Sequence, residues 1–324
     1  MAACDPRARP IAGFLGGSFF GGSFLGGSFL ACLLLAAFLL AGLLACGPRG
    51  ETQPGTGPEA GTSDRAIQNK GSDTLVNLAL AWAEAYRRIR PDVTIAVTGG
   101  GTGTGIAALI NNTVDIANAS RRMKESEIAQ ARANGIEPTE RAVAVDALAV
   151  IVNPGNPVSQ MTIGQLSDLF TGRITNWEGV GGRDAPVVLV SREINSGTHV
   201  YFLEEVIRGG DKENKSLFAS QTLLMPSSVG ITSEIGRNPN AIGYDGLGYV
   251  TEHEKVLAVA RRDGDSYILP SVATATDGSY PLSRDLFMYT AGAPQGEIAA
   301  YLDWVVGGDG QDIVRKLGFV PLPN

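Results

Sequence analysis

The sequence predicts an α/β protein of two lobes that follows an N-terminal targeting segment. Strand-like and helix-like stretches alternate from Ala66 to Leu317, a pattern typical of α/β architecture. At three places a turn of Gly, Ser and Thr residues comes between a strand and the next helix. About 260 residues remain after the targeting segment and its linker, which is enough chain for two lobes of ordinary size.

The targeting segment covers residues 1–45 and has the features of a lipoprotein signal peptide. Arg7 and Arg9 give it a positive start, three near-copies of Gly-Gly-Ser-Phe follow, and a leucine-rich run fills residues 30–44. The junction Leu-Leu-Ala-Cys46 resembles a lipobox, whose cysteine becomes lipidated and N-terminal. Two alternatives are open: an uncleaved transmembrane helix, for which about 15 apolar residues are short, and repeats that belong to an over-extended gene start.

Cysteine usage and composition agree with export and anchoring. Cys4, Cys32 and Cys46 are the only cysteines, so the chain beyond them has no disulfide, thiol nucleophile or cysteine-based metal site. Residues 46–64 combine the lipidated cysteine with a tether of Pro, Gly, Thr and Glu that has too little apolar surface to fold. We therefore expect a periplasmic protein held to the membrane through Cys46, with residues 65–324 as its binding domain.

Charge and motif content exclude several function classes. The formal net charge of −7 does not favour nucleic acid, whose binding would want a basic face. His199 and His253 are the only histidines, and the glycine run at 99–105 matches neither the dinucleotide pattern nor the P-loop pattern, so we expect no metal and no cofactor. A negative protein can still bind an anion when local hydrogen bonds and one cation overcome the long-range repulsion.

The elements expected in the first half follow from hydrophobic spacing and turn residues. Residues 66–70 suit a short strand, and apolar residues from Leu75 to Ile89 recur at helical spacing until Pro91 ends the helix. The further elements are a strand at 93–97, a helix opened by the turn 99–105, a strand at 115–120, a polar helix at 124–134 and a buried strand at 142–152 that crosses between the lobes.

The second half shows the same alternation. A helix begins at Thr162 and ends at Phe170, and a central strand at 187–190 leads into Ser191 and Arg192. The further elements are a helix from Ser196 to Ile207, strands at 241–244 and 286–289, and helices at 297–306 and 311–317.

Three turns share one chemistry: Gly71 to Thr74, Gly101 to Thr104, and Ser196 to Thr198. A helix start leaves backbone N–H groups without partners and attracts anions, while glycine lets a ligand approach and hydroxyls add donors. One such turn is more often only a helix N-cap. Three of them, if they converge, predict a cage for an oxyanion.

Arg192 supplies the cation for this cage. It stands four residues before Ser196, between the end of a strand and the start of a helix. Its fork of N–H groups suits a tetrahedral oxyanion, because it donates two parallel hydrogen bonds. The alternative is a surface arginine paired with Glu193 or another acid.

These motifs together resemble those of periplasmic phosphate-binding proteins of the Pst type. Arg192 to Thr198 matches their Arg-x-x-x-Ser-Gly-Thr signature. Other similar stretches span residues 66 to about 320: Gly71–Leu75, Gly100–Ile106, Val114–Arg121, Ile151–Pro157, Phe170–Trp177 and Ala241–Tyr244.

The resemblance implies a type II periplasmic-binding-protein fold, in which two α/β lobes close on the ligand about a hinge. Lobe 1 would comprise residues from about 65 to 145 and from about 265 to 324, and lobe 2 those from about 146 to 264. It further implies inorganic phosphate as the ligand, the permease of an ABC transporter as the partner, and no catalytic residue.

The resemblance also implies which residues contact phosphate. They are Thr74, the Leu75 backbone, Thr102, Arg192, Ser196, Gly197 and Thr198. The composition of the turns adds Ser72 and Gly103. Ser120 and Arg121 follow the strand at 115–120 and are further candidate donors, although Arg121 is equally suited to neutralising a nearby acid.

One position departs from the family pattern. In the stretch that corresponds to Val114–Arg121, many members place an aspartate directly after the serine. This aspartate accepts the proton of hydrogen phosphate, and this chain has Arg121 in its place. Asp146, within an apolar run, is our candidate substitute, because a buried carboxylate accepts a proton from hydrogen phosphate and repels sulfate. The alternative is a salt bridge from Asp146 to Arg121 or Arg122.

Three rival functions are compatible with some of these motifs. A serine hydrolase would use Ser196 and His199, but residues three apart at a helix start do not aim the imidazole at the hydroxyl. Sulfate and molybdate receptors use similar cages and generally lack the site arginine, which makes Arg192 the discriminating residue. A phosphate sensor or scavenger without transport stays open as well.

Overall fold

The computed structural model of the protein describes residues 66–322. The expected signal peptide (1–45), the lipidation at Cys46 and the tether that ends at residue 64 lie outside the described residues. Across 66–322, no helix combines the length and the apolar character that a membrane crossing requires.

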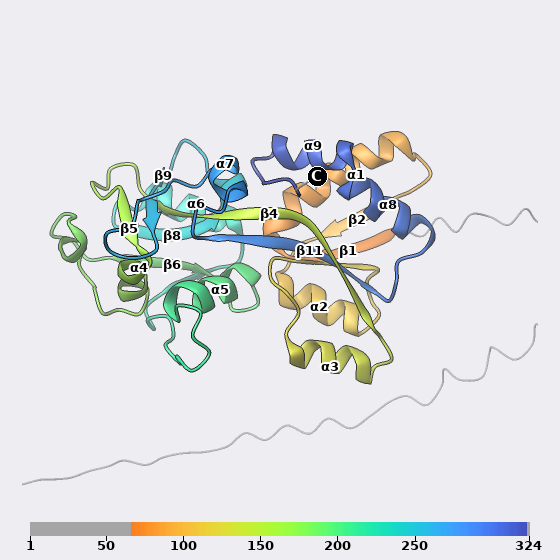
Figure 1. Ribbon diagram of the computed structural model, residues 1–324, viewed down its shortest axis with the longest axis horizontal. Helices are drawn as coiled ribbons and strands as arrows, with labels where there is room; N and C mark the ends of the chain where they lie inside the picture. Colours follow the sequence, from red (N-terminus) through yellow and green to blue (C-terminus); the bar gives the residue numbers. More distant parts are fainter. Residues whose placement is uncertain (1–65, 323–324) are drawn as a thin grey trace, which may run out of the picture. The chain divides into compact units, whose positions relative to one another are not determined.

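A mixed sheet organises the described chain, with strand order β2-β1-β3-β11-β4-β8-β6-β7 (Figure 1). Pairing is parallel from β2 through β3, antiparallel on both sides of β11 and between β4 and β8, and parallel from β8 through β7. The strands are β1 (Ile67–Gly71), β2 (Ile95–Thr98), β3 (Ile116–Ala119), β4 (Pro138–Val152), β6 (Val188–Arg192), β7 (Leu223–Met225), β8 (Ala241–Gly246) and β11 (Ser283–Ala291). Three short strands complete the set: β9 (Lys255–Val256) pairs with β4, and β5 (Gln160–Thr162) pairs with β10 (Ala258–Ala260).

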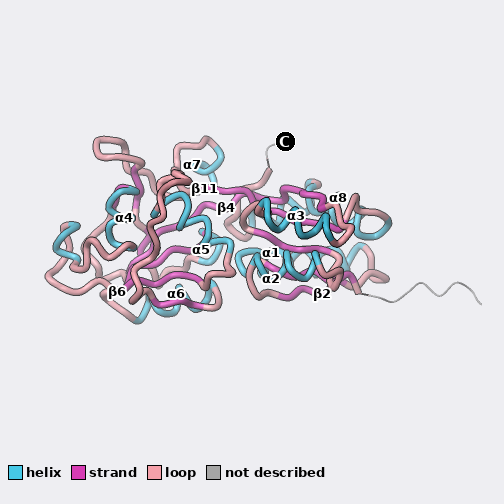
Figure 2. The backbone as a smooth tube through the Cα atoms, turned by 90° about the horizontal axis from the view of Figure 1, so that it is seen from below, coloured by secondary structure: helices cyan, strands magenta, loops and turns pink. Residues whose placement is uncertain are grey.

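Helices cover this sheet and connect its strands (Figure 2). The α-helices are α1 (Val76–Ile89), α2 (Thr102–Ile110), α3 (Glu125–Ala133), α4 (Ile163–Phe170), α5 (Gly197–Phe202), α6 (Ser228–Arg237), α7 (Val272–Thr276), α8 (Gly296–Val306) and α9 (Gly308–Lys316). Short helical turns are η1 (Asp73–Leu75), η2 (Trp177–Val180), the π-helical η3 (Leu203–Ile207) and η4 (Leu247–Tyr249). The alternation of strands and helices confirms the predicted α/β class.

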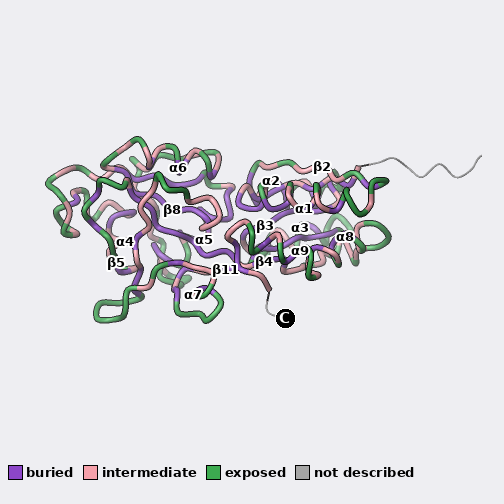
Figure 3. The backbone as a smooth tube through the Cα atoms, turned by 90° about the horizontal axis from the view of Figure 1, so that it is seen from above, coloured by how far each residue is buried: buried purple, intermediate pink, exposed green. Residues whose placement is uncertain are grey.

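Strands β4 and β11 run side by side between the two lobes (Figure 1). The first part of β4 pairs with β11 as far as Ala147, and its last part, from Leu148 to Val152, pairs with β8. The last ten residues of β4 are nearly all buried, which is why the sequence shows one long apolar run there (Figure 3). The predicted crossing strand at 142–152 is therefore present, and begins four residues earlier.

Separate hydrophobic clusters define the two lobes. Lobe 1 packs Trp82 and Tyr301 between α1, α8 and the sheet, and lobe 2 packs Phe170, Phe202 and Tyr244. The rings of Phe202 and Tyr244 stack with centroids 3.7 Å apart. Ala275 of α7 belongs to the lobe 2 cluster, and so do Tyr280 and Leu282, which lie between α7 and β11.

Candidate functional site

The first turn is built at the end of β1. Gly71 has a φ of 146°, and a Cβ at this position would lie 2.2 Å from the carbonyl oxygen of Asn118, so only glycine fits. The Ser72 N–H donates to that same oxygen at 2.8 Å, which ties the turn to β3. The Leu75 N–H donates to the Ser72 carbonyl at 3.0 Å, so this expected ligand donor already has a partner within η1.

The second turn opens α2 and contacts the residue that follows β3. The side-chain oxygen of Thr102 accepts from the Ser120 N–H at 3.1 Å and lies 3.2 Å from the Ser120 hydroxyl. The Gly103 N–H donates to the carbonyl of Asn195 at 3.0 Å, and the Asn195 amide donates to the carbonyl of Gly100 at 3.0 Å. Since Asn195 lies in lobe 2, these bonds join the second turn to the loop that precedes α5.

The third turn opens α5 and meets both of the others. Ser196 is the N-cap, and its hydroxyl accepts from the Thr198 N–H at 3.1 Å. A Cβ on Gly197 would lie 2.4 Å from the Ser120 hydroxyl and 2.6 Å from that of Thr102, so glycine is required for the close approach. The Thr198 hydroxyl lies 2.9 Å from that of Thr74. The structure thus brings the three predicted turns together.

Arg192 is buried beside these turns, with 1% of its surface exposed. Its Nη2 donates to the carboxylate of Asp73 at 2.7 Å and to the Pro226 carbonyl, and its Nη1 donates to the Ser228 hydroxyl at 3.1 Å. Its Nε donates to the carbonyl of Met225 at 3.3 Å. The alternative of a surface arginine paired with Glu193 or another acid holds only in part, because Arg192 is buried and pairs with another acid, Asp73.

Asp146 is fully buried in β4 and pairs with an arginine that the sequence did not point to. Its Oδ2 accepts from Arg284 Nη2 at 3.0 Å, whereas its Oδ1 has no hydrogen-bond partner among the described residues. Burial raises the pKa of Asp146, and the charge and hydrogen bond of Arg284 together with the backbone N–H of Leu247 oppose that rise. A carboxylate with one free oxygen is suited to accepting a proton.

The expected alternative for Asp146, a salt bridge to Arg121 or Arg122, is wrong. Arg121 pairs with Glu127 at 2.7 Å, and Arg122 pairs with Glu140 at 2.8 Å. The idea that Arg121 neutralises Asp146 fails for the same reason. Its pairing with Glu127 also gives no support to Arg121 as a ligand donor, although its Nε has no partner among the described residues.

Several polar residues of the site were missed from the sequence. Asp73 lies inside the first turn, Arg284 is the second residue of β11, and Asp245 is the next-to-last residue of β8 and bonds Ser228 of α6. The Oδ1 of Asp245 accepts from the Ser228 hydroxyl at 3.0 Å and from the Gly246 N–H at 2.8 Å. Burial raises the pKa of Asp245 to about 6, against the lowering effect of Arg192. Asp245 and Arg284 could have been suspected from the sequence, because each is a charged residue within two positions of a predicted strand.

Two chains of hydrogen bonds meet at adjacent residues of η1. One runs from Asp73 through Arg192 and Ser228 to Asp245. The other runs from Thr74 through Thr198 and Arg284 to Asp146. Both chains start in lobe 1 and enter lobe 2, so the site is assembled from both lobes.

His199 does not serve Ser196. Its Nδ1 lies 3.1 Å from the Ser191 hydroxyl, and its ring stacks on Phe218 with centroids 4.5 Å apart. Burial lowers the pKa of His199, which keeps the imidazole neutral. Among residues 66–322, His199 is therefore not placed as a base for Ser196, and the pair that a serine hydrolase would need is not formed by these two residues.

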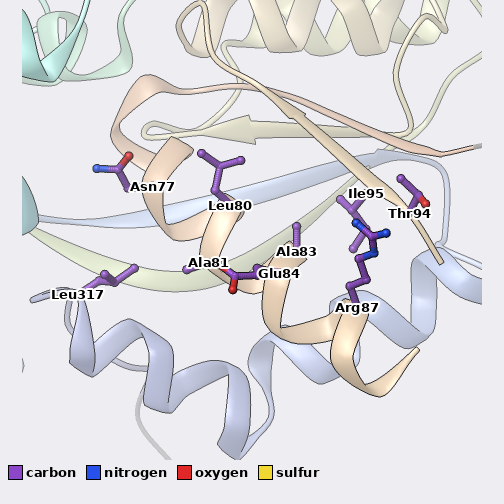
Figure 4. A pocket seen from close by; sticks show the side chains of 9 residues that line it. All are labelled: Asn77, Leu80, Ala81, Ala83, Glu84, Arg87, Thr94, Ile95 and Leu317. Carbon is purple, nitrogen blue, oxygen red and sulfur yellow. The ribbon is translucent and has the colours of Figure 1, made fainter. Parts of the chain in front are cut away.

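Some surface hollows of the described residues lie away from these chains. One of them is formed by α1, the start of β2 and the residue after α9, and Figure 4 shows side chains such as Leu80, Arg87 and Leu317 around it. None of its nine lining residues belongs to the three turns. Within residues 66–322 no group of three or more His, Cys, Asp or Glu side chains is placed to hold a metal ion.

The chain matches the family model described as a PBP superfamily domain over residues 52–309. The phosphate-binding protein PstS of Pseudomonas aeruginosa is 34% identical over 274 residues, which cover 79% of this chain and 83% of that protein. PstS of Bacillus subtilis is 31% identical over 284 residues, which cover 86% of this chain and 89% of that protein. The chain belongs to the family of Pst-type phosphate-binding proteins.

Solved structures of this family share the fold. A substrate-binding protein from Clostridium perfringens, assigned to a phosphate ABC transporter and solved with bound phosphate, superposes with a TM-score of 0.70 at 31% identity, over 80% of this chain and 100% of that one. An ABC-type phosphate transport receptor from Vibrio cholerae gives a TM-score of 0.62 at 28% identity, over 79% and 100% of the two chains. The predicted two-lobed periplasmic-binding-protein fold is thereby confirmed.

Proposed function

We propose that the protein is an extracytoplasmic solute-binding lipoprotein that captures inorganic phosphate and delivers it to an ABC permease. The observation that carries the proposal is the meeting of three Gly/Ser/Thr turns from two lobes beside the buried Arg192. Such a meeting offers hydroxyls, helix starts and one positive charge, which are the groups that bind a tetrahedral oxyanion. The PstS relatives support phosphate as that anion.

The proposed phosphate contacts come from the three turns, the end of β3 and β6. They are Ser72, Thr74, Leu75, Thr102, Gly103, Ser120, Arg192, Ser196, Gly197 and Thr198, with Asp146 as the acceptor of the ligand's proton. Gly103 gains a free N–H when the lobes separate, because its present acceptor Asn195 lies in lobe 2. Arg121 stands outside this set, since its guanidinium donates to Glu127.

The proposed hinge runs through β4 and β11, which join the lobes. Lobe 1 then comprises residues from about 65 to 145 together with the C-terminal segment, and lobe 2 begins at about 146. The packing of Tyr280 and Leu282 in the lobe 2 cluster moves the second boundary from about 265 to the start of β11. Closure about this hinge would satisfy donors of both lobes around one anion.

Calorimetric titration of the full-length protein tests the ligand. The protein is kept in mild detergent, freed of carried-over ligand, and titrated with phosphate, sulfate and molybdate. Binding of one phosphate with little response to sulfate supports the proposal. No phosphate binding, or equal responses to all three anions, would show that the chain shares the fold of its family but not its ligand.

Binding without catalysis is the second part of the proposal. The base that a nucleophilic Ser196 would need is held by Ser191 instead. Release of nitrophenol from nitrophenyl phosphate should stay at the buffer rate with the purified protein. A faster rate that Ser196→Ala abolishes would make the protein a hydrolase.

The lipid anchor is the third part. Residues 1–45 are removed in this proposal, and Cys46 carries the acyl chains. Radiolabelled palmitate should enter the expressed protein, and Cys46→Ser should abolish both the label and partitioning into a detergent phase. Label that survives Cys46→Ser would assign the membrane attachment to another residue.

A further inference from the structure

Arg284 is a buried arginine, and only one of its three guanidinium nitrogens is hydrogen-bonded within the described residues. Its side chain is 4% exposed. Its Nη2 donates to Asp146 Oδ2 at 3.0 Å and to the Thr198 hydroxyl at 2.8 Å, while its Nε and Nη1 have no hydrogen-bond partner within residues 66–322. Buried donors of this kind are nearly always paired in proteins. The two free nitrogens therefore call for an acceptor that the chain itself does not provide.

Arg192 differs from Arg284 in this respect. Each of the three guanidinium nitrogens of Arg192 donates to a protein acceptor, among them Asp73 and Ser228. Arg192 supplies charge to the site, but most of its hydrogen-bonding capacity is already committed. Of these two arginines, Arg284 is the one with guanidinium nitrogens, Nε and Nη1, that donate to no described residue and can donate to a ligand.

The position of Arg284 holds its guanidinium next to the three turns. It lies opposite Asp146 in the register of β11 and β4, the strands that join the lobes. The ring of Tyr201 covers the guanidinium, with the Cζ of Arg284 5.2 Å from the ring centroid, and the Tyr201 hydroxyl donates to the carbonyl of Ser283. Two hydrogen bonds, which share the Thr198 hydroxyl, connect the guanidinium to Thr74.

Arg284 and Asp146 together present two complementary free groups. Arg284 holds Oδ2 of the carboxylate, which leaves Oδ1 of Asp146 without a partner among the described residues. An oxyanion that carries both an unprotonated oxygen and a hydroxyl matches this pair, because the first accepts from the guanidinium and the second donates to the carboxylate. Hydrogen phosphate has both groups near neutral pH, and sulfate has only the first.

We propose that Arg284 is a second anion-binding residue, which contacts the bound oxyanion through nitrogens that the protein leaves free, and that the Arg284–Asp146 pair selects a protonated oxyanion. This inference rests on the proposed function, the capture of phosphate. It assigns the selection of phosphate over sulfate to Arg284 of β11 and Asp146 of β4, in addition to the contacts from the three turns.

A double-mutant cycle separates ligand binding by Arg284 from simple neutralisation of Asp146. Wild type, Arg284→Gln, Asp146→Asn and the double variant are titrated with phosphate and sulfate as full-length proteins in mild detergent. Arg284→Gln leaves Asp146 without its partner and can unfold the protein, whereas the double variant removes both charges. Thermal unfolding followed by circular dichroism, without ligand, selects the variants that are folded. Arg122→Gln is the matched control, because Arg122 is exposed and pairs with Glu140.

The expected result is a loss of affinity in both backgrounds. Arg284→Gln should weaken phosphate binding at least about 30-fold in the wild type, as for the loss of a buried hydrogen-bonded charge, and at least about 10-fold in the Asp146→Asn background. Arg284→Lys should recover part of the loss. Arg122→Gln should bind phosphate as the wild type does.

Two outcomes would overturn the inference, and they differ in what they imply for the proposed function. If the double variant binds phosphate as tightly as Asp146→Asn alone, Arg284 serves only to neutralise Asp146, and the proposed function stands. If the wild type binds no phosphate, the proposed function itself fails, and the inference fails with it.

Discussion

The side-chain oxygens of Thr74 and Thr198 lie 2.9 Å apart, although 124 residues separate them in the sequence. Thr74 belongs to lobe 1 and Thr198 to lobe 2, and both side chains are buried. Each hydroxyl can donate one hydrogen bond and accept two, so the pair can rotate its hydrogens toward an anion without moving the backbone. This contact is one of several through which the two lobes meet at the site.

Thr198→Val tests the role of this contact. Valine keeps the shape of threonine but removes the hydroxyl that bonds Thr74 and accepts from Arg284. Phosphate affinity should fall about 10-fold or more, since a hydrogen bond to a charged group contributes roughly 1.5–3 kcal/mol. Calorimetric titration measures the change. Thr113→Val is the control, because Thr113 is exposed and bonds only the Ala108 carbonyl; equal affinity in the two variants would remove Thr198 from the site.

Arg192→Gln should weaken phosphate binding strongly. The substitution removes a buried positive charge and leaves the carboxylate of Asp73 without its 2.7 Å partner. Truncating one member of such a pair costs about 2–5 kcal/mol, or roughly 30-fold to several thousand-fold in affinity. Arg173→Gln, at an exposed arginine that pairs with Asp168, should bind normally. Tight phosphate binding by a folded Arg192→Gln protein would be incompatible with the proposed site.

Asp146→Asn should reduce the preference for phosphate over sulfate. The amide can donate to sulfate through its nitrogen, whereas the carboxylate repels that anion and accepts the proton of hydrogen phosphate. Competition between sulfate and labelled phosphate measures the ratio of affinities at pH 7.5. Asp285→Asn, at the exposed neighbour of Arg284, is the control. An unchanged ratio would leave Asp146 with the structural role of pairing with Arg284.

Asp245→Asn should change how stability depends on pH. The pKa of Asp245 is raised to about 6 in the folded protein, above its ordinary value of 3.8, so the folded state loses stability as pH rises from about 4 to 6. The cost above pH 6 is on the order of 3 kcal/mol, and asparagine removes it. The free energy of unfolding in urea, measured from pH 4 to 8, should therefore favour the variant increasingly over the wild type as pH rises. A difference that is constant with pH would contradict the raised pKa.

The predicted elements agreed with the structure where hydrophobic spacing is strong. The stripe from Leu75 to Ile89 forms η1 and α1, and the apolar run at 142–152 forms most of β4. Helix α6 was missed, because Ser228 to Arg237 contains glycine and β-branched residues of low helix propensity. That helix forms because Ile231 and Ile235 pack against β6 and β8 in the lobe 2 core.

The three turns could be found from the sequence, but their convergence could not. Gly, Ser and Thr at a helix start are a local pattern, and each turn has the cap or close approach that such residues favour. That Gly197 packs on Ser120 and Thr102 depends on how the lobes are joined. No local pattern carries that information.

What the sequence by itself determined is the α/β alternation, the long crossing strand, the three turns and the place of Arg192 between a strand and the third turn, because spacing and turn chemistry act within a few residues. What only the tertiary structure decided is the partner of each buried charge. Asp146 and Arg284 are 138 residues apart and meet through the register of β4 with β11, and Asp73 meets Arg192 across the lobes. A buried charge needs a partner of opposite charge, and the fold determines which residue lies close enough to be that partner. Proximity in the sequence therefore does not reveal the partner.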